Sequence, residues 1–432
     1  MLQRVLLVSA NALAHRVSTA QHDYPFRNVS PMRLLGVLGV TAQVVAGLEN
    51  GLVRTPPMGT NDWNSLEAKY PAWTKYGFNA SAVLGTARAL VSTGLRDKGY
   101  TYVNIDCGWT TGFRDSASGA LVANATLYPG GLALLAKQIN AMNLQFGIYT
   151  SGKMCCGPQD ANDGIVGHEA TDVAQLHELG FTFIKNDDCG STSASFGKAR
   201  DAILNASTPM VHSIHTSFTH GHPWPDAIDP SHAREIAHTF RTTRDIRPTF
   251  DDILDRATRN DKYAPLAGPG YFNDPDMLEV GIKGVSDAEG RSHMALWSLI
   301  KAPLLIGCDL TTASDVTLAT LGAVEVIKVN QDALGAQGRL IASASTPESQ
   351  VWAGQLTQPG CYAVVLLHVG DSPAGVNVTV TVEMLRPGLP SDTKLTVRDL
   401  WNRKDVGIFL GAYTAHVPGV HDNAMLKVCG AK

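Results

Sequence analysis

Residues 181–187 read FTFIKND, and the fold prediction for this chain starts from them. Aromatic and β-branched residues favour an extended strand, and the run ends in a lysine, an asparagine and an aspartate. A short apolar run with polar residues at its end is typical of a buried strand in a parallel sheet. Similar runs are expected to form strands at 57–63, 100–106, 144–150, 210–216, 272–278 and 303–310, with one more just before Asp245.

Helical patterns separate these strands. They lie at 82–98, 130–142, 167–179 and 287–301. Short strands that alternate with helices indicate parallel β/α units. Eight such units in about 280 residues match the size of a (β/α)8 TIM barrel, so an α/β catalytic barrel is predicted over residues 47–338.

The strand ends carry polar or aromatic residues. They are Trp63, Asp106, Tyr149, Asp187, His215, Asp245, Asp276 and Asp309. In a barrel the C-terminal ends of the strands converge on one mouth. A single aspartate there is explained by helix capping, but four or more converging carboxylates repel one another and are costly without a use. The mouth is therefore the predicted functional site.

The pattern changes after residue 338. Runs with β-type alternation lie at 340–343, 350–356, 361–368, 376–382 and 394–400, without helical patterns between them. This favours a C-terminal antiparallel β-sandwich domain over residues 339–432, which covers one side of the barrel.

The first 46 residues are predicted to be a leader. Met32 and Arg33 precede the apolar run 34–40, and a cleavage site fits best after Ala46. Residues 32–46 are interpreted as a signal peptide, 1–31 as upstream sequence that is not translated, and the protein as secreted to the extracellular space. The alternative for this segment is a buried apolar helix.

Secretion would permit glycosylation and disulfides. Four Asn-x-Ser/Thr sites are candidates for glycosylation: Asn79, Asn124, Asn205 and Asn377. Seven cysteines are an odd number, so at least one lacks an intramolecular partner.

Charge and composition exclude other classes. The chain has 432 residues, with 35 basic and 39 acidic residues and no block of like charge, so a nucleic-acid or anionic-membrane partner is not expected. No apolar run reaches the roughly 18 residues of a transmembrane helix. No cofactor and no metal are expected, because zinc-binding H-E-x-x-H and EF-hand patterns are missing from the sequence. A metal-dependent barrel enzyme is the alternative hypothesis, and loss of activity in the presence of a chelator would indicate it.

Several motifs stand in order between about residue 54 and residue 340. They are Thr55-Pro56-Pro57-Met58-Gly59 with Trp63-Asn64-Ser65, Tyr102-Val103-Asn104-Ile105-Asp106, Gly147-Ile148-Tyr149, Lys185-Asn186-Asp187-Asp188-Cys189, Arg241-Thr242-Thr243-Arg244-Asp245-Ile246, Asn273-Asp274-Pro275-Asp276-Met277-Leu278-Glu279-Val280-Gly281 and Val329-Asn330-Gln331-Asp332. Together they resemble glycoside hydrolase family 27, the α-galactosidase or melibiase family, and in particular its secreted fungal members.

The resemblance implies a retaining α-galactosidase that removes terminal non-reducing α-D-galactose from galacto-oligosaccharides or galactomannans. By the motif match Asp187 is the nucleophile and Asp245 is the acid/base residue. Repulsion between the two carboxylates is expected to separate their apparent pKa values. Asp188 competes locally with Asp187, and the alignment of Lys185 and Cys189 selects Asp187. The resemblance also implies substrate-binding roles for Trp63, Asp106, Tyr149, Lys185, His215, Arg241 and Asp276.

Two departures affect specificity. The family usually has two consecutive aspartates after the second strand, whereas here Cys107 follows Asp106. The position on the fifth strand that often carries a glutamate falls near His215. α-N-acetylgalactosaminides and β-L-arabinopyranosides therefore stay as alternative substrates, and a non-catalytic sugar-binding barrel as an alternative function.

The resemblance also places a disulfide between Cys155 and Cys189, behind the nucleophile, with Cys156 as a competitor for Cys155. A second bridge, between Cys361 and Cys429, is expected in the C-terminal domain.

Overall fold

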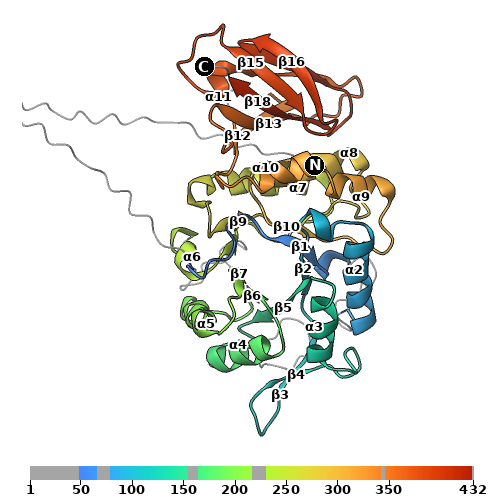
Figure 1. Cartoon of the computed structure of the whole chain (residues 1–432), viewed down its shortest axis with the longest axis vertical. Coiled ribbons are helices and arrows are strands. Elements are labelled where there is room, and N and C mark those ends of the chain that lie inside the picture. Colours follow the sequence, from blue (N-terminus) through green and yellow to red (C-terminus); the bar gives the residue numbers. More distant parts are fainter. Residues whose placement is uncertain (1–47, 66–77, 154–163, 217–229, 342–345, 431–432) are drawn as a thin grey trace, which may run out of the picture. The chain divides into compact units, whose positions relative to one another are not determined.

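The computed structural model describes residues 48–65, 78–153, 164–216, 230–341 and 346–430. Eight parallel strands form one sheet in the order β10-β1-β2-β5-β6-β7-β8-β9, surrounded by helices (Figure 1). The strands are β1 (Met58–Asn61), β2 (Tyr102–Ile105), β5 (Gln145–Ser151), β6 (Phe183–Asp187), β7 (Val211–Ile214), β8 (Thr239–Arg241), β9 (Phe272–Asp274) and β10 (Leu304–Ile306). All eight strands expected from the sequence are present.

The two ends of this sheet meet. Leu278, which follows β9, forms a parallel bridge with Ile306 of β10. The amide of Leu278 donates to the carbonyl of Leu305 at 2.8 Å, and the amide of Gly307 donates to the carbonyl of Leu278 at 2.9 Å. The predicted (β/α)8 barrel is therefore confirmed.

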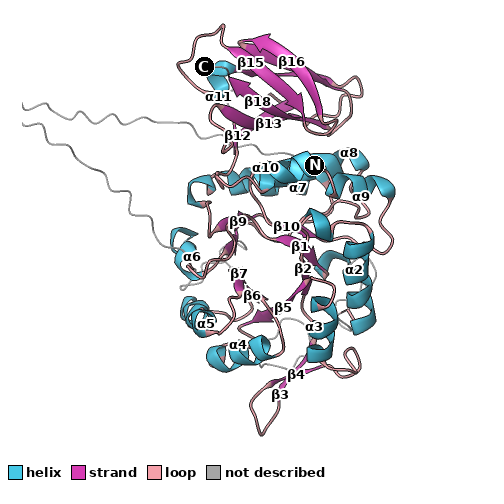
Figure 2. Ribbon diagram, viewed as in Figure 1, coloured by secondary structure: helices cyan, strands magenta, loops and turns pink. Residues whose placement is uncertain are grey.

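The helices begin at side-chain caps where the sequence offers them. Asn79, Thr192, Thr249 and Ser314 each accept an amide of the first turn, and Ser286 forms a full capping box with Glu289. The barrel helices are α2 (Ala80–Ser92), α3 (Leu132–Asn140), α4 (Glu169–Glu178), α5 (Ser193–Asn205), α6 (Pro230–Ile236), α7 (Phe250–Asp261), α8 (Asp287–Leu299), α9 (Asp315–Leu321) and α10 (Val324–Asn330), with 3-10 turns at Arg96–Lys98 and Ala264–Leu266. Figure 2 shows them around the sheet.

The N-terminal end of the barrel is closed by the segment 48–53. Leu52 and Val53 pack against Tyr102, Phe183 and Val211, which lie at the starts of three strands. The side chain of Asn50 donates to the carbonyl of Met210 at 2.9 Å and lies 2.9 Å from Nε2 of His238. Because this end is filled by the chain itself, the opposite end is the one open to substrate.

A hairpin that the sequence did not predict follows β2. Strands β3 (Thr110–Arg114) and β4 (Leu121–Ala123) pair antiparallel beside the barrel. The guanidinium of Arg114 makes two hydrogen bonds to the buried carboxylate of Asp172 in α4, at 2.6 and 2.7 Å. This bidentate contact holds the hairpin to the barrel.

The C-terminal part is an antiparallel β-sandwich, as predicted. Its larger sheet has the order β11-β12-β13-β18-β15-β16, and its smaller sheet pairs β14 with β17. The strands are β11 (Arg339–Leu340), β12 (Ser349–Gln355), β13 (Cys361–His368), β14 (Val376–Thr381), β15 (Lys394–Asp399), β16 (Lys404–Leu410), β17 (Ala412–Val417) and β18 (Asn423–Gly430). The last three were not expected, and Val382, expected to end a strand, instead begins the short helix α11 (Val382–Leu385).

A disulfide joins Cys361 and Cys429, which are paired across β13 and β18, so this predicted bridge is confirmed. The sandwich contacts α8 through the ion pair of Arg291 with Asp422.

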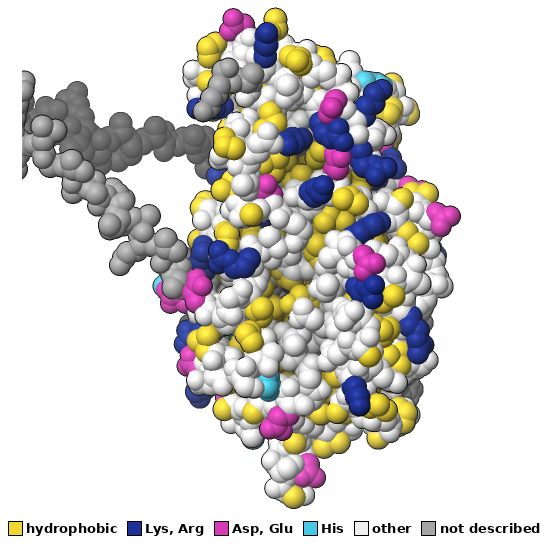
Figure 3. Space-filling model, viewed as in Figure 1, with side chains coloured by type: hydrophobic (Ala, Val, Ile, Leu, Met, Phe, Trp, Pro, Cys, Tyr) yellow, Lys and Arg dark blue, Asp and Glu magenta, His cyan; other side chains and the backbone are white. Residues whose placement is uncertain are grey.

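Basic and acidic side chains alternate over the visible face without a patch of one sign (Figure 3). Among the described residues, no helix is both long enough and apolar enough to cross a membrane.

Candidate active site

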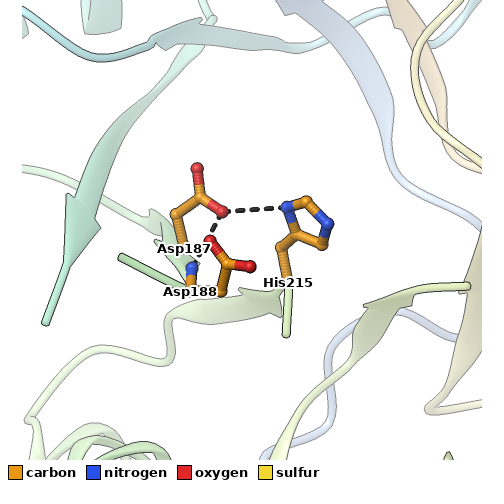
Figure 4. A group of neighbouring side chains, drawn as sticks. All are labelled: Asp187, Asp188 and His215. Carbon is orange, nitrogen blue, oxygen red and sulfur yellow. Dashed lines mark hydrogen bonds and ion pairs between the residues drawn. The ribbon is translucent and has the colours of Figure 1, made fainter. Parts of the chain in front are cut away.

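Asp187 is the last residue of β6, and its carboxylate is held from two sides (Figure 4). Nδ1 of His215, one residue beyond β7, lies 2.9 Å from Oδ1 of Asp187. The amide of Asp188 donates to the same oxygen at 2.8 Å. Sequence positions 28 residues apart meet here because β6 and β7 are neighbouring parallel strands.

Lys185 lies on the same strand, two residues before Asp187, and therefore points to the same face. Its ammonium is 2.7 Å from Oδ2 of Asp106, which follows β2, and 5.3 Å from the centre of the Tyr149 ring. Asn61 at the end of β1 also donates to Oδ2 of Asp106, at 2.9 Å. Four strands thus contribute to one polar cluster at the mouth.

A third group forms around Arg241, the last residue of β8. Its Nη2 lies 2.7 Å from Oδ2 of Asp276 and 3.0 Å from Oδ1 of Asp245. Arg241 and Asp276 are buried, whereas the side chain of Asp245 is 56 % exposed. Asp245 is therefore the carboxyl group of this cluster that an incoming substrate can reach.

Both the backbone and the side chain of Asp276 are held in place by several hydrogen bonds, more than a helix cap or turn would make. Its φ is 102°, in a region that non-glycine residues rarely occupy. Its two carboxylate oxygens accept the amides of Met277 and Ile246, at 2.8 and 2.9 Å, and its carbonyl accepts the indole N–H of Trp297 at 2.7 Å. These contacts compensate for the backbone strain and orient Arg241.

The surrounding charges keep Asp187 ionised. Burial by itself raises the pKa of this carboxyl, but the imidazole of His215, through its charge and its hydrogen bond, and then the ammonium of Lys185 bring the pKa far below the usual range. An ionised carboxylate is what nucleophilic attack needs.

The surrounding cations also favour the ionised form of Asp245. Burial raises its pKa, and the charge of Asp187 acts in the same direction, but the guanidinium of Arg241, followed by His215 and Lys185, brings the pKa below the ordinary value. The sequence suggested that repulsion between Asp187 and Asp245 would separate their pKa values. In the structure the cations lower the pKa of both groups.

Tyr149 and Trp63 complete the mouth. Burial, and then the charges of Asp187 and Asp106, raise the pKa of Tyr149 well above 10, so that its hydroxyl keeps its proton. Trp63 lies just beyond β1, where it is half-buried and packs on the barrel core. The structure thus places all nine of the sequence-predicted site residues at the same end of the barrel.

Asp309 follows β10 and makes hydrogen bonds within the turn after that strand. Its carboxylate accepts the amide of Thr311 at 3.0 Å and the hydroxyl of the same residue at 2.6 Å, so its visible role is to hold the turn after β10.

Within the described part of the chain, one group of side chains could hold a cation. Asp187, Asp188 and His215 offer ligand atoms that all lie within 4.8 Å of one another. Carboxylate and imidazole are ligands that zinc and related ions accept. A cation there would bind a carboxylate oxygen of Asp187.

The cysteines near the site agree in part with expectation. Cys189 is disulfide-bonded, as is Cys107, for which the sequence suggested no partner. Cys155 and Cys156 lie outside the described residues, so the predicted Cys155–Cys189 pairing stays a prediction. Cys308 is a buried free thiol.

Sequence reasoning missed Asn61 and Asp62. Asn61 donates to Asp106, and Oδ1 of Asp62 accepts the amide of Asp106 at 2.7 Å. The only available signal was their position directly before Trp63 at the end of a strand.

The fold and this mouth are those of a (β/α)8-barrel enzyme with acidic and basic side chains at the C-terminal ends of its strands. The family model described as alpha galactosidase A matches residues 55–332, and the model for the alpha galactosidase C-terminal beta sandwich domain matches residues 346–428. The chain belongs to the alpha-galactosidase A family.

Individual relatives agree with this. The chain is 39 % identical to an alpha-galactosidase from Oryza sativa subsp. japonica, over 82 % of this chain and 80 % of the relative. It is 37 % identical to an alpha-galactosidase from Cyamopsis tetragonoloba, over 85 % of each chain. The crystal structure of alpha-galactosidase I from Mortierella vinacea superposes with a TM-score of 0.77 at 28 % identity, covering 88 % of this chain and 98 % of that one.

Proposed function

We propose that this protein is a retaining α-galactosidase that removes terminal non-reducing α-D-galactose from oligosaccharides or galactomannans. The observation that carries the proposal is the carboxylate of Asp187, held ionised by His215 and Lys185 at the end of β6. The family and the relatives named above support the substrate class.

The proposed reaction has two steps. An oxygen of Asp187 attacks the anomeric carbon, the bond to the glycosidic oxygen breaks, and Asp245 gives its proton to that leaving oxygen. A water molecule then gives a proton to Asp245, its hydroxyl bonds to the anomeric carbon, and the carboxylate of Asp187 is released.

Asp245 must carry a proton at the first step, although Arg241 favours its ionised form in the free enzyme. We therefore propose that the active form dominates on the acid side of neutrality. Arg241 also contacts the carboxylate of Asp276, so it can remain paired there when Asp245 is protonated.

The substrate-binding roles proposed for the remaining residues follow from their contacts. Lys185 and Arg241 present donors, Asp106 an acceptor, and Trp63 and Tyr149 apolar faces. His215 contacts the proposed nucleophile, and Asp276 orients Arg241. α-N-acetylgalactosaminides and β-L-arabinopyranosides are the alternative substrates, and a panel of nitrophenyl glycosides would rank them.

The experiment that tests the function is proton NMR of the sugar first released from nitrophenyl α-D-galactoside. Retention requires α-galactose as the first product. Release of β-galactose would show that Asp187 acts as a base on water and would overturn the double-displacement mechanism. Asp187→Asn should lower kcat by at least about a thousandfold. Asp188→Asn, one residue away, is the matched control and should keep most of the activity.

We also propose that the protein is secreted and glycosylated. The side chains of Asn79, Asn205 and Asn377 are exposed, whereas Asn124 is half-buried and its Oδ1 accepts the amide of Thr126. The predicted signal peptide lies outside the described residues. Mass spectrometry of the secreted protein should find an N-terminus near Gly47, and peptides from residues 1–31 would contradict this.

A further inference from the structure

Members of the alpha-galactosidase A family usually carry two consecutive aspartates after strand β2. Here the first is Asp106, and the second is replaced by Cys107, which is disulfide-bonded and buried. A different carboxyl group lies beside this position. Asp62 follows β1, and its Oδ1 accepts the amide of Asp106 at 2.7 Å. Since β1 and β2 are paired in parallel, the ends of both strands open onto the same mouth.

We propose that Asp62 is a substrate-binding residue, whose carboxyl group binds a sugar hydroxyl in place of the aspartate that is missing after Asp106. The inference rests on the proposed function, and it assigns a specificity-determining contact to that same site.

The hydrogen bonds of Asp106 support this assignment. Its Oδ1 accepts the amide of Cys107 at 2.8 Å, and its Oδ2 accepts both Asn61 and Lys185. Asp106 is only 3 % exposed, so its acceptor capacity is largely used by the protein. Asp106 holds the ammonium of Lys185 and has at most about one acceptor position left for a sugar hydroxyl.

The carboxyl group of Asp62, in contrast to that of Asp106, accepts no side-chain hydrogen bond from the described residues. Asp62 is half-buried, and among those residues its carboxyl group accepts hydrogen bonds from backbone amides only. The contact of Oδ1 with the amide of Asp106 fixes the orientation of the group at the end of β1. A polar group that is preorganised in this way loses little entropy when it binds a hydroxyl.

Protonation gives Asp62 a further property. Burial, followed by the charge of Asp106, raises the pKa of Asp62 to about 8. Below that pH the group is a neutral carboxylic acid, which can donate its O–H to a sugar oxygen and accept a hydroxyl proton. Two ionised carboxylates side by side would repel each other, and the proton removes that repulsion.

The rival explanation is that Asp62 only anchors the loop after β1. A structural anchor would affect every substrate equally, whereas a binding contact disappears with the hydroxyl that it binds. The test therefore measures kcat and KM for nitrophenyl α-D-galactoside and its 4-deoxy and 6-deoxy analogues. The variants are Asp62→Ala, Asp62→Asn and, as control, Asp115→Ala. Asp115 is an exposed aspartate that also accepts a backbone amide, that of Ser118 at 2.8 Å.

Asp62→Ala should raise KM for the galactoside about tenfold, in line with the loss of one hydrogen bond to a buried polar group. The increase should vanish for one of the two deoxy analogues. A carboxamide is a neutral donor and acceptor of nearly the same shape, so Asp62→Asn should recover most of the loss, and Asp115→Ala should change no KM. An equal increase for all three substrates, or no increase, would overturn the proposal.

Two measurements keep this test independent of turnover and of variant folding. Calorimetry with galactose should show about tenfold weaker binding to Asp62→Ala than to the wild type. If the wild type binds no galactose, the proposed function fails, and if both bind equally, only the role of Asp62 fails. A crystal structure of the wild type with galactose should place a carboxyl oxygen of Asp62 about 3 Å from a hydroxyl, and a separation beyond about 4 Å would refute the contact.

Discussion

Nδ1 of His215 lies 2.9 Å from Oδ1 of Asp187, and because an ionised carboxylate only accepts hydrogen bonds, the imidazole carries a proton on that nitrogen. The histidine is buried, so this contact is shielded from solvent. It is one of the interactions that keep the pKa of Asp187 low. The sequence places His215 on the fifth strand, at a position linked to substrate specificity. In the structure this residue directly contacts Asp187, the proposed nucleophile.

His215→Ala should shift the acid limb of kcat/KM to higher pH, by about one to two units. The imidazole lowers the pKa of Asp187, so its loss lets this carboxylate take up a proton at a higher pH. The rate at the optimum should fall about 10- to 100-fold, because the orientation of the carboxylate is also lost. A pH profile of the variant checks this, with the exposed His416→Ala as control. An unchanged acid limb would contradict the coupling.

Asp245→Asn should separate substrates by their leaving groups. Dinitrophenyl galactosides need little protonation, so their first step should slow by less than about tenfold, whereas raffinose-type oligosaccharides should slow by about 10³ or more. Pre-steady-state kinetics should show accumulation of the galactosyl-enzyme. Added azide should accelerate turnover and form α-galactosyl azide, and an equal loss for both substrate types would rule out the acid/base role.

Chelators should leave activity unchanged, because the proposed chemistry uses the carboxylate of Asp187 directly. Added Zn²⁺ should inhibit, since Asp187, Asp188 and His215 can surround a cation. Asp188→Asn should weaken this inhibition about tenfold at nearly normal turnover. Loss of activity in EDTA that Zn²⁺ restores would instead favour a metal-dependent enzyme.

Stability should fall as the pH decreases below about 6.5. Burial lowers the pKa of His212 to about 4 and that of His238 to about 3, whereas unfolded histidine titrates near 6.5. Between these values only the unfolded chain binds the protons, so acid favours unfolding, by on the order of 3 kcal/mol for each group. Urea denaturation from about pH 7 to about pH 4 measures this dependence. His238→Gln should make it shallower, whereas the exposed His416→Gln should leave it unchanged.

Removing the disulfide Cys361–Cys429 should destabilise the C-terminal domain. The bridge closes a loop with a sequence separation of 68, for which the loss of chain entropy in the unfolded state corresponds to about 4 kcal/mol. The double variant Cys361→Ala/Cys429→Ala should therefore unfold at lower temperature in calorimetry. Substitution of the buried free thiol, Cys308→Ala, is the control for losing a small core side chain.

The barrel was predictable because its strands are buried on both faces, and buried parallel strands are continuous apolar runs. FTFIKND is β6 with two residues before it, and Cys361–His368 was predicted with the observed bounds. The strands β16 and β17 were missed because exposed residues interrupt their apolar pattern, as in 404–408. The strand β18 was missed although all its residues are buried or half-buried. The hairpin of β3 and β4 was missed because it contains Gly112 and is held by a distant partner, Asp172.

Strand length and hydrophobic pattern are local properties of the sequence. Which residues stand at the ends of the strands could therefore be predicted without a structure. Asp187, Asp245 and Asp106 were placed at one mouth in this way. Their partners became visible only in the folded chain: His215 with Asp187, Arg241 with both Asp276 and Asp245, and Asp62 with the amide of Asp106. Such pairings depend on strand register and barrel closure, which bring together residues dozens of positions apart. The charge states follow from those distances, because electrostatic interaction and desolvation act through space and not along the chain.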